Sequence, residues 1–305
     1  MKREWSSFVL AALLTVAVGC APVATPAPTA VLPTAAPVEP IATAVRPTAT
    51  VAPTATTAPT ATPEPVTLNV FAAASLTDAF NEIKGKFEAA NPGVTVAYNF
   101  AGSNALAQQL GEGAPADVFA SANKKQMDVA IEAGRVVTGT TQVFVRNRLV
   151  LIVPKDNPAN VETLQDLAKT GLKLILAAKD VPVGQYSLDF LDKAAADAAF
   201  GAAFKDDVLA NVVSYEDNVR SVLTKVALGE GDAGIVYTSD ISGDAAKDVV
   251  SIEIPDALNT IAQYPIGAVK DSANAAVAEA FIAYVLSADG QAILESYGFI
   301  PAAGK

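Results

Sequence analysis

Patterns typical of β-strands and of α-helices alternate along this chain from about Val66 to its end. Runs rich in β-branched and aromatic residues predict strands, and apolar residues three or four apart predict helices. The expected strands are 67–72, 94–98, 117–120, 148–153, 173–177, 211–214, 233–237, 249–254 and 264–269. The expected helices are 76–89, 104–111, 123–132, 162–169, 185–195, 218–228, 272–286 and 288–296. Such alternation predicts an α/β fold with mostly parallel sheets.

The composition excludes several kinds of functional site. The 305 residues, 51% of them hydrophobic and 17% charged, are enough for two modest domains with sizeable cores. There is no histidine and Cys20 is the only cysteine, which excludes His/Cys metal sites, Ser-His-Asp triads and disulfides from the folded part. A net charge of −11 without clustered Lys or Arg argues against a nucleic acid or an acidic membrane as partner.

The first 20 residues are predicted to be a lipoprotein signal peptide and not part of the fold. Lys2 and Arg3 precede an apolar run, 8–18, that has the length of a signal-peptide core and is too short to cross a bilayer comfortably. The run ends in AVGC, which resembles the lipobox of bacterial lipoproteins, with Ala17 in place of the usual larger aliphatic residue. The resemblance implies cleavage before Cys20 and attachment of lipid to that cysteine.

Residues 21–65 have the composition of a disordered tether. They are almost entirely Ala, Thr, Pro and Val, with Glu39, Arg46 and Glu64 as the only charges. The scattered prolines prevent helix and sheet, and the small side chains offer nothing to bury. Tether and lipid together predict a globular part that works outside the cell membrane while attached to it.

The stretch Thr67–Phe80, TLNVFAAASLTDAF, runs from a predicted strand directly into a predicted helix. We expect Ser75 to be the N-cap of that helix, with Asp78 in the capping-box position. Small residues before a helix N-terminus leave backbone N–H groups exposed, and the helix dipole adds a partial positive charge there. This junction is therefore a candidate anion site.

Four further junctions have the same character. Ser103 is expected to cap the helix of FAGSNALAQQL, and Gly102 permits close backbone approach. Gly184 removes side-chain bulk beside the helix start in VPVGQY. The third junction is YEDNVR, which opens the next helix and in which Arg220 is expected to pair with Glu216 or Asp217. The last junction is the strand GIVY, which ends at the hydroxyl of Tyr237. The carboxyl ends of parallel strands gather at one edge, so these junctions are expected to meet.

The motifs resemble, in order and spacing, the periplasmic molybdate-binding proteins of ABC transporters. They are TLNVFAAASLTDAF, FAGSNALAQQL, GAPADVFASANKKQMD, VPVGQYSLDFL, EDNVRSVL, AGIVYTSD, QYPIGAV and YGFIPA. The resemblance implies a type II periplasmic binding protein fold, with two α/β lobes joined by crossing strands. It assigns 66–146 and 255–305 to lobe 1 and 147–254 to lobe 2, with hinges near 144–149 and 250–266.

The same resemblance implies five ligand positions for an oxyanion. Ser75 and Ser103 lie on lobe 1, and Val183, Val219 and Tyr237 lie on lobe 2. The first four positions provide backbone N–H groups, the serines add hydroxyls, and the tyrosine adds its phenol. Molybdenum would be bound as molybdate through these residues, and no separate cofactor is implied.

A site made only of neutral donors selects among anions. Monohydrogen phosphate carries an O–H that needs an acceptor, whereas molybdate, tungstate and sulfate are fully deprotonated. Sulfate is smaller than molybdate and would stretch the hydrogen bonds of a rigid cage. The size argument does not separate molybdate from tungstate.

Three classes of function are therefore compared. The first is a lipid-anchored, monomeric molybdate or tungstate receptor that closes on its ligand and delivers it to the permease and ATPase of an ABC importer. The second is a receptor of the same fold for sulfate or ferric ion, although no Tyr-Tyr pair suited to ferric ion occurs. The third is an enzyme such as a phosphatase or a sulfotransferase-like protein, for which the chain offers no histidine and no metal cluster.

Overall fold

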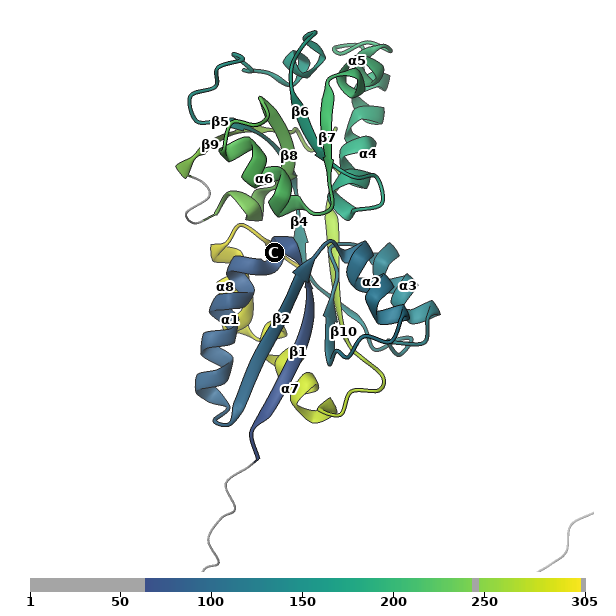
Figure 1. Ribbon diagram of the computed structural model, residues 1–305, viewed down its shortest axis with the longest axis vertical. Coiled ribbons are helices and arrows are strands. Elements are labelled where there is room, and N and C mark those ends of the chain that lie inside the picture. Colours follow the sequence, from purple (N-terminus) through teal and green to yellow (C-terminus); the bar gives the residue numbers. More distant parts are fainter. Residues whose placement is uncertain (1–63, 243–246, 303–305) are drawn as a thin grey trace, which may run out of the picture. The chain divides into compact units, whose positions relative to one another are not determined.

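The computed structural model describes residues 64–242 and 247–302. These residues contain two β-sheets, drawn one above the other in Figure 1. The order of the first sheet is β11-β4-β10-β3-β1-β2, and that of the second is β7-β6-β8-β5-β9. The predicted signal peptide, Cys20 and the tether up to residue 63 lie outside the described residues.

The first sheet is mixed. Its strands are β1 (Val66–Ala73), β2 (Val94–Ala101), β3 (Val118–Ala120), β4 (Gln142–Asn147), β10 (Ala262–Ala268) and β11 (Ile300–Pro301). β1 pairs in parallel with β2 and β3, while β10 is antiparallel to β3 and β4. The carboxyl ends of β1, β2 and β3 therefore lie at one edge, the edge at which ligands bind in open α/β sheets.

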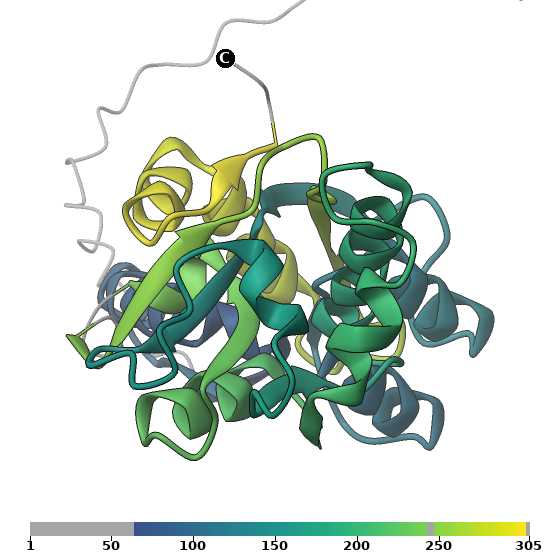
Figure 2. The ribbon, with the colours of Figure 1, turned by 90° about the horizontal axis from the view of Figure 1, so that it is seen from above.

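Helices cover both faces of this sheet, so β1 is buried on both sides. The helices are α1 (Thr77–Ala90), α2 (Ser103–Gly111), α3 (Lys124–Glu132), α7 (Ala275–Leu286) and α8 (Ala288–Ser296). Figure 2 shows α8 in yellow and α2 and α3 in blue-green on opposite sides of the strands. Val70 shares a core with Phe80 and Phe281, whereas Phe71 packs in a second cluster with Leu106 and Phe119. Alternating directions of successive side chains explain why the end of β1, Val70–Ala73, is apolar at every position.

The second sheet is also mixed and carries its own helices. Its strands are β5 (Leu149–Pro154), β6 (Leu174–Ala177), β7 (Val212–Glu216), β8 (Ala233–Tyr237) and β9 (Val249–Glu253). The helices are α4 (Pro182–Ala196), α5 (Phe204–Ala210) and α6 (Val219–Ala227). A Cβ at Gly234 of β8 would lie 2.9 Å from side-chain atoms of both Val222 and Val226. The missing side chain therefore lets α6 lie close against the sheet.

The chain crosses between the two sheets twice. β4 ends at Asn147 and β5 begins at Leu149, and later β9 ends at Glu253 and β10 begins at Ala262. The predicted hinge segments, 144–149 and 250–266, contain these two crossings. The second sheet is therefore built from one continuous segment, β5 to β9, whereas the first combines β1–β4 with β10 and β11 from beyond the second crossing.

Several predicted elements are wrong in detail. The segment 162–169 contains a 3-10 helix, Leu164–Ala168, and no α-helix. β11 and the seven-residue α5 were not expected, and β4 was expected only as a hinge strand near 144–149. Short elements present too few apolar positions for a period to be recognised. The expectation of mostly parallel sheets is also wrong, since β10 and β5 each pair antiparallel with both neighbours. Among the described residues no single helix is long and apolar enough to span a membrane; only α7 and α8 together reach that length, with a 60° bend between them.

Candidate functional site

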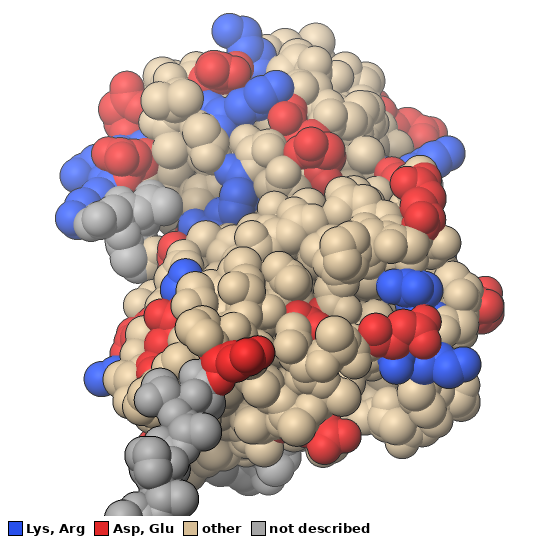
Figure 3. Space-filling view, turned by 60° about the horizontal axis from the view of Figure 1, so that its bottom comes forward, with Lys and Arg blue, Asp and Glu red and all other residues tan. Residues whose placement is uncertain are grey.

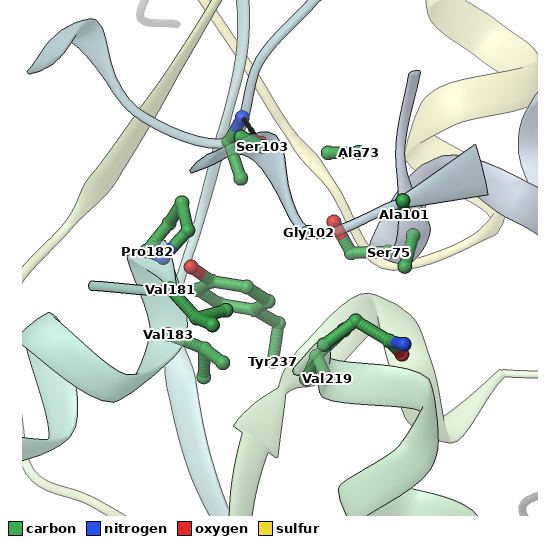
Figure 4. A pocket seen from close by; sticks show the side chains of 13 residues that line it. Ala73, Ser75, Ala101, Gly102, Ser103, Val181, Pro182, Val183, Val219 and Tyr237 are labelled. Carbon is green, nitrogen blue, oxygen red and sulfur yellow. Dashed lines mark hydrogen bonds between the residues drawn. The ribbon is translucent and has the colours of Figure 1, made fainter. Parts of the chain in front are cut away.

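A small cavity lies between the two sheets, where three helices and a 3-10 turn begin (Figure 4). Its atoms enclose about 210 Å³ of empty space, part of it open to solvent. None of the lining residues is Lys, Arg, Asp or Glu. They are Ala73, Ala74, Ser75, Ala101, Gly102, Ser103, Ala122, Val181, Pro182, Val183, Asn218, Val219 and Tyr237.

The five predicted ligand positions all line this one cavity. Ser75 and Ser103 follow strands of the first sheet. Figure 4 shows them facing three residues of the other half, Val183 on α4, Val219 on α6 and Tyr237 at the end of β8. Each of the five is at most 4% exposed. The structure thus brings together residues that are separated by up to 162 positions in the sequence, as the numbers 75 and 237 show.

The two valines lie in the first turns of α6 and α4, where N–H groups have no acceptor within the helix. Val219 is the first residue of α6, and the side chain of Asn218 caps that helix by accepting from Ser221 N at 3.0 Å. The cap therefore leaves the Val219 N–H free for the cavity. Val183 follows Pro182, the first residue of α4, which has no N–H, so Val183 offers the first N–H of that helix.

The two serines also lie in first turns, but neither is an N-cap, contrary to the prediction. Ser75 lies inside a 3-10 turn, Ala74–Leu76, and α1 begins after it at Thr77 with no side-chain cap. Ser103 is the first residue of α2, and Gly102 is its N-cap. A residue inside the first turn can direct both its N–H and its hydroxyl away from the helix, which is the arrangement that an anion requires.

Each serine hydroxyl already has a protein partner. Ser103 Oγ accepts from Ala122 N at 2.9 Å. Ser75 Oγ lies 2.9 Å from the hydroxyl of Tyr264, which is fully buried on β10. Asn147 Nδ2 donates to the same Tyr264 hydroxyl at 3.3 Å and to Ser239 Oγ at 2.8 Å.

Tyr237 presents a hydroxyl that is buried and has no hydrogen-bond partner among the described residues. Burial raises the pKa of this phenol well above its usual value of 10, and the neighbouring Tyr264 raises it further, so it stays protonated. An unpaired buried hydroxyl is costly, by about 1–3 kcal/mol. A ligand that accepts from it removes that cost.

Arg220, which follows the lining residue Val219, is neutralised by two carboxylates. Arg220 forms ion pairs with Asp78, which belongs to α1, and with Asp240, whose carboxylate oxygen lies 3.3 Å from Arg220 Nε. The expectation that Arg220 pairs with Glu216 or Asp217 is therefore wrong, and Glu216 pairs with Lys225 at 2.7 Å instead. On the face seen in Figure 3, basic and acidic residues lie interspersed and form no single basic patch.

The two halves of the molecule touch around the cavity. Asn104 Nδ2 donates to Asp180 Oδ2 at 2.8 Å, and Gln126 Nε2 donates to the carbonyl oxygen of Asp180 at 3.3 Å. A Cβ at Gly102 would lie 2.4 Å from the carbonyl oxygen of Asp217. Gly102 thus permits the approach of the other half's backbone.

Sequence reasoning missed several residues that support the site. Tyr264 lies in the quoted motif QYPIGAV, but nothing in its pattern shows that its hydroxyl reaches Ser75. The role expected for Gly184 also differs: a Cβ there would lie 2.1 Å from the carbonyl oxygen of Ala178. Gly184 therefore allows α4 to start close to its own preceding loop, and it does not line the cavity.

This arrangement is suited to holding a small anion by dipoles. Helix N-termini and neutral hydroxyls surround the cavity without a counter-charge. No group of three or more His, Cys, Asp or Glu side chains that would hold a bare metal ion occurs in residues 64–242 and 247–302.

Two α/β halves, joined by two crossings and enclosing a donor-lined cavity, define a solute-binding protein of the type II periplasmic fold. The chain belongs to the bacterial extracellular solute-binding protein family, whose sequence profile it matches over residues 68–300. It is 40% identical over 230 residues to the molybdate-binding protein ModA of Mycobacterium tuberculosis, covering 75% of this chain and 83% of the relative. These matches confirm the family that the sequence motifs indicated.

Two solved structures share the fold at low sequence identity. The periplasmic molybdate-binding protein of Azotobacter vinelandii is 22% identical with a TM-score of 0.66, and the match covers 76% of this chain and 98% of that one. The sulfate-binding protein SubI of Mycobacterium tuberculosis is 20% identical with a TM-score of 0.69, covering 78% of this chain and 87% of that one. The fold alone therefore does not distinguish a molybdate receptor from a sulfate receptor.

Proposed function

We propose that this protein is an extracytoplasmic receptor that binds molybdate, or tungstate, between its lobes and delivers it to the permease and ATPase of an ABC importer. The observation that carries the proposal is the cavity in which two serines, two helix-start valines and an unpartnered tyrosine hydroxyl converge. The 40% identity to proteins named for molybdate binding supports the choice of ligand.

The ligand contacts follow from the chemistry of the five residues. Ser75, Ser103, Val183 and Val219 donate from their backbone N–H groups, the serines also from their hydroxyls, and Tyr237 from its phenol. Molybdenum is held through its oxygen atoms and not as a bare ion. Each charge-assisted hydrogen bond contributes about 1.5–3 kcal/mol before the dehydration of the anion is subtracted.

Binding is coupled to closure, because each half supplies only part of the donor set. We infer that 66–146 with 255–305 move as one lobe and that 147–254 move as the other, about the crossings near Arg148 and at 254–261. The anion makes its full set of bonds only when the lobes meet, so it stabilises the closed form. The permease then recognises that closed form.

The remaining parts of the proposal concern location and assembly. Cys20 carries lipid after signal cleavage, and the tether holds the domain outside the membrane. The protein works as a monomeric receptor and not as an enzyme, since the cavity presents donors without a nucleophile and base.

Isothermal titration calorimetry with molybdate, tungstate, sulfate and phosphate tests the proposal. Calorimetry is preferable to tryptophan fluorescence, because Trp5 is the only tryptophan and lies in the predicted signal segment. We expect one molybdate or tungstate per chain, weaker binding of sulfate and the weakest binding of phosphate. Tighter binding of sulfate than of molybdate would identify a sulfate receptor, and no binding of any oxyanion would refute the proposal.

A further inference from the structure

Tyr264 lies behind the cavity, where its hydroxyl contacts Ser75 but does not line the space itself. Its ring is fully buried and packs edge-on against Tyr237, with ring centroids 5.9 Å apart. Burial raises the pKa of Tyr264, so the phenol keeps its proton. The direction in which that proton points decides what Ser75 offers to a ligand.

Asn147 fixes one side of this hydrogen-bond chain. Its Oδ1 accepts from Arg148 N at 2.9 Å, and a backbone N–H can only donate. Thr238 Oγ1 lies 2.9 Å from the same oxygen. The other end of the amide is therefore Nδ2, which donates to the Tyr264 hydroxyl at 3.3 Å.

Tyr264 must then donate onward to Ser75. Among the described residues, its hydroxyl has two partners within hydrogen-bond geometry, Asn147 Nδ2 and Ser75 Oγ. The first is a donor, so only Ser75 Oγ can accept the phenol proton. The opposite direction would leave a buried O–H without an acceptor, which is costly.

The hydrogen bond that Tyr264 donates determines how the hydroxyl of Ser75 is oriented. Tyr264 occupies one of the two lone pairs of Oγ, and no other partner of Ser75 Oγ occurs among the described residues. The O–H of Ser75 therefore finds its acceptor in the cavity, where an anion oxygen supplies one. Ser103 Oγ likewise accepts a hydrogen bond, in this case from the N–H of Ala122, which occupies one of its lone pairs. Both serines therefore face the ligand as donors.

We propose that Tyr264 is a positioning residue that makes Ser75 a hydrogen-bond donor to the bound anion, and that it thereby sets the discrimination against oxyanions that carry a proton. Without the phenol, the hydroxyl of Ser75 is free to rotate, so Oγ can turn a lone pair to the cavity and accept from the O–H of hydrogen phosphate. This inference rests on the proposed oxyanion function and adds a residue outside the cavity that controls its selectivity.

The test compares sulfate with phosphate in Tyr264→Phe, because these anions are similar in size but only phosphate carries a proton at neutral pH. The matched control is Tyr98→Phe, which removes a partly buried tyrosine's hydrogen bond to the Phe80 carbonyl in the same half without approaching the cavity. Competition calorimetry against molybdate gives the affinity of each anion. A thermal melt of each ligand-free variant establishes that it is folded.

In Tyr264→Phe we expect the ratio of sulfate affinity to phosphate affinity to fall about tenfold, because phosphate gains an acceptor that sulfate does not need. In Tyr98→Phe the ratio stays at the wild-type value. The effect must also disappear when Tyr264→Phe is combined with Ser75→Ala, since the lone pair that accepts the phosphate proton is then absent. An unchanged ratio in folded Tyr264→Phe, or an equal effect in the Ser75→Ala background, overturns the inference.

A second variant and the wild-type binding data separate failure of the proposed function from failure of the role of Tyr264. If Tyr264→Phe does not fold, Ser75→Ala is measured alone. Sulfate then loses a donor while the O–H of phosphate no longer faces one, so the ratio of sulfate affinity to phosphate affinity should fall, and an unchanged or higher ratio overturns the inference. If the wild-type protein binds neither molybdate nor sulfate, the proposed function fails. If the wild type binds molybdate and the ratio does not move in the variant, only the role of Tyr264 fails.

Discussion

The buried carboxylate of Asp240 accepts a hydrogen bond from the backbone N–H of Tyr237 at 3.0 Å. This contact fixes the start of the 3-10 turn, Thr238–Ile241, directly after the strand that carries the candidate ligand Tyr237. Asp240 is fully buried, and its charge is held by Arg220, which also reaches Asp78 on the other half. The position of Tyr237 is thus linked to a contact between the halves.

The first prediction concerns the pH dependence of stability. Burial raises the pKa of Asp240 from 3.8 to about 6, against the opposing effect of Arg220. Ionisation is thus harder in the folded protein than in the unfolded chain, and it lowers the free energy of unfolding as pH rises from about 4 to about 6. In Asp240→Asn this loss is absent, so the stability of the variant relative to wild type should increase by about 3 kcal/mol across that interval.

Urea denaturation of both ligand-free proteins at the two ends of the interval measures this difference. The comparison cancels the titration of acids that both proteins share, such as Asp166, whose pKa is lowered to about 2. A difference between the two proteins that does not change with pH would contradict the raised pKa of Asp240.

Val219→Pro tests a backbone donor without breaking its helix. Proline is favoured at the first position of a helix, and Asn218 before it already has the extended backbone, φ −157° and ψ 167°, that a following proline requires. The substitution removes the N–H that faces the cavity and replaces the valine side chain by the proline ring. We expect molybdate affinity to fall about tenfold to a hundredfold, measured by calorimetry.

Val219→Ala is the matched control for that substitution. It shortens the same buried side chain but keeps the N–H, so it should lower the melting temperature while leaving most of the molybdate affinity. If alanine and proline weakened binding equally, the side chain and not the N–H of Val219 would be the contributing group.

Tyr237→Phe should weaken binding without weakening the fold. The phenol hydroxyl has no partner among the described residues, so its removal from the ligand-free protein breaks no hydrogen bond. We expect an unchanged or slightly higher melting temperature and a loss of molybdate affinity of about tenfold or more. A clear fall in melting temperature with undiminished affinity would assign the tyrosine to the core and remove it from the site.

Gly102→Ala should oppose closure. The added Cβ would lie 2.4 Å from the Asp217 carbonyl oxygen, a backbone atom of the other half that cannot turn away as a flexible side chain can. We expect molybdate affinity to fall about tenfold or more while the melting temperature of the ligand-free protein changes little. Calorimetry and a thermal melt measure the two effects.

The control for Gly102→Ala is Gly85→Ala in α1, where a Cβ would meet nothing within 4 Å. That change should leave binding intact and stabilise the helix by about 0.5–1 kcal/mol. Unaltered affinity in Gly102→Ala would show that the halves do not approach as closely in the liganded protein as they do in this structure.

How far the sequence could predict this structure depended on the range of the interactions. Strands such as 67–72 and helices such as 218–228 follow from local periodicity, and the family motifs brought Ser75 and Tyr237 into one site. The partners of those residues did not follow. Ser75 meets Tyr264 across 189 positions, and Arg220 meets Asp78 across 142, and no local pattern encodes such pairings. Even the helix caps were misjudged, because Ser75 and Ser103 turn toward the cavity and away from their own helices.

The close approach of Gly102 to the Asp217 carbonyl also bears on how far the two halves can close. Both partners are backbone, which cannot turn aside as a flexible side chain can, so we expect this contact to limit how closely the two halves approach each other. The backbone would then set the width of the cavity, and that width would not adjust to the size of the bound anion. We therefore expect that an anion with shorter bonds cannot bring the two halves closer together, so that some of its oxygen atoms lie too far from their donors.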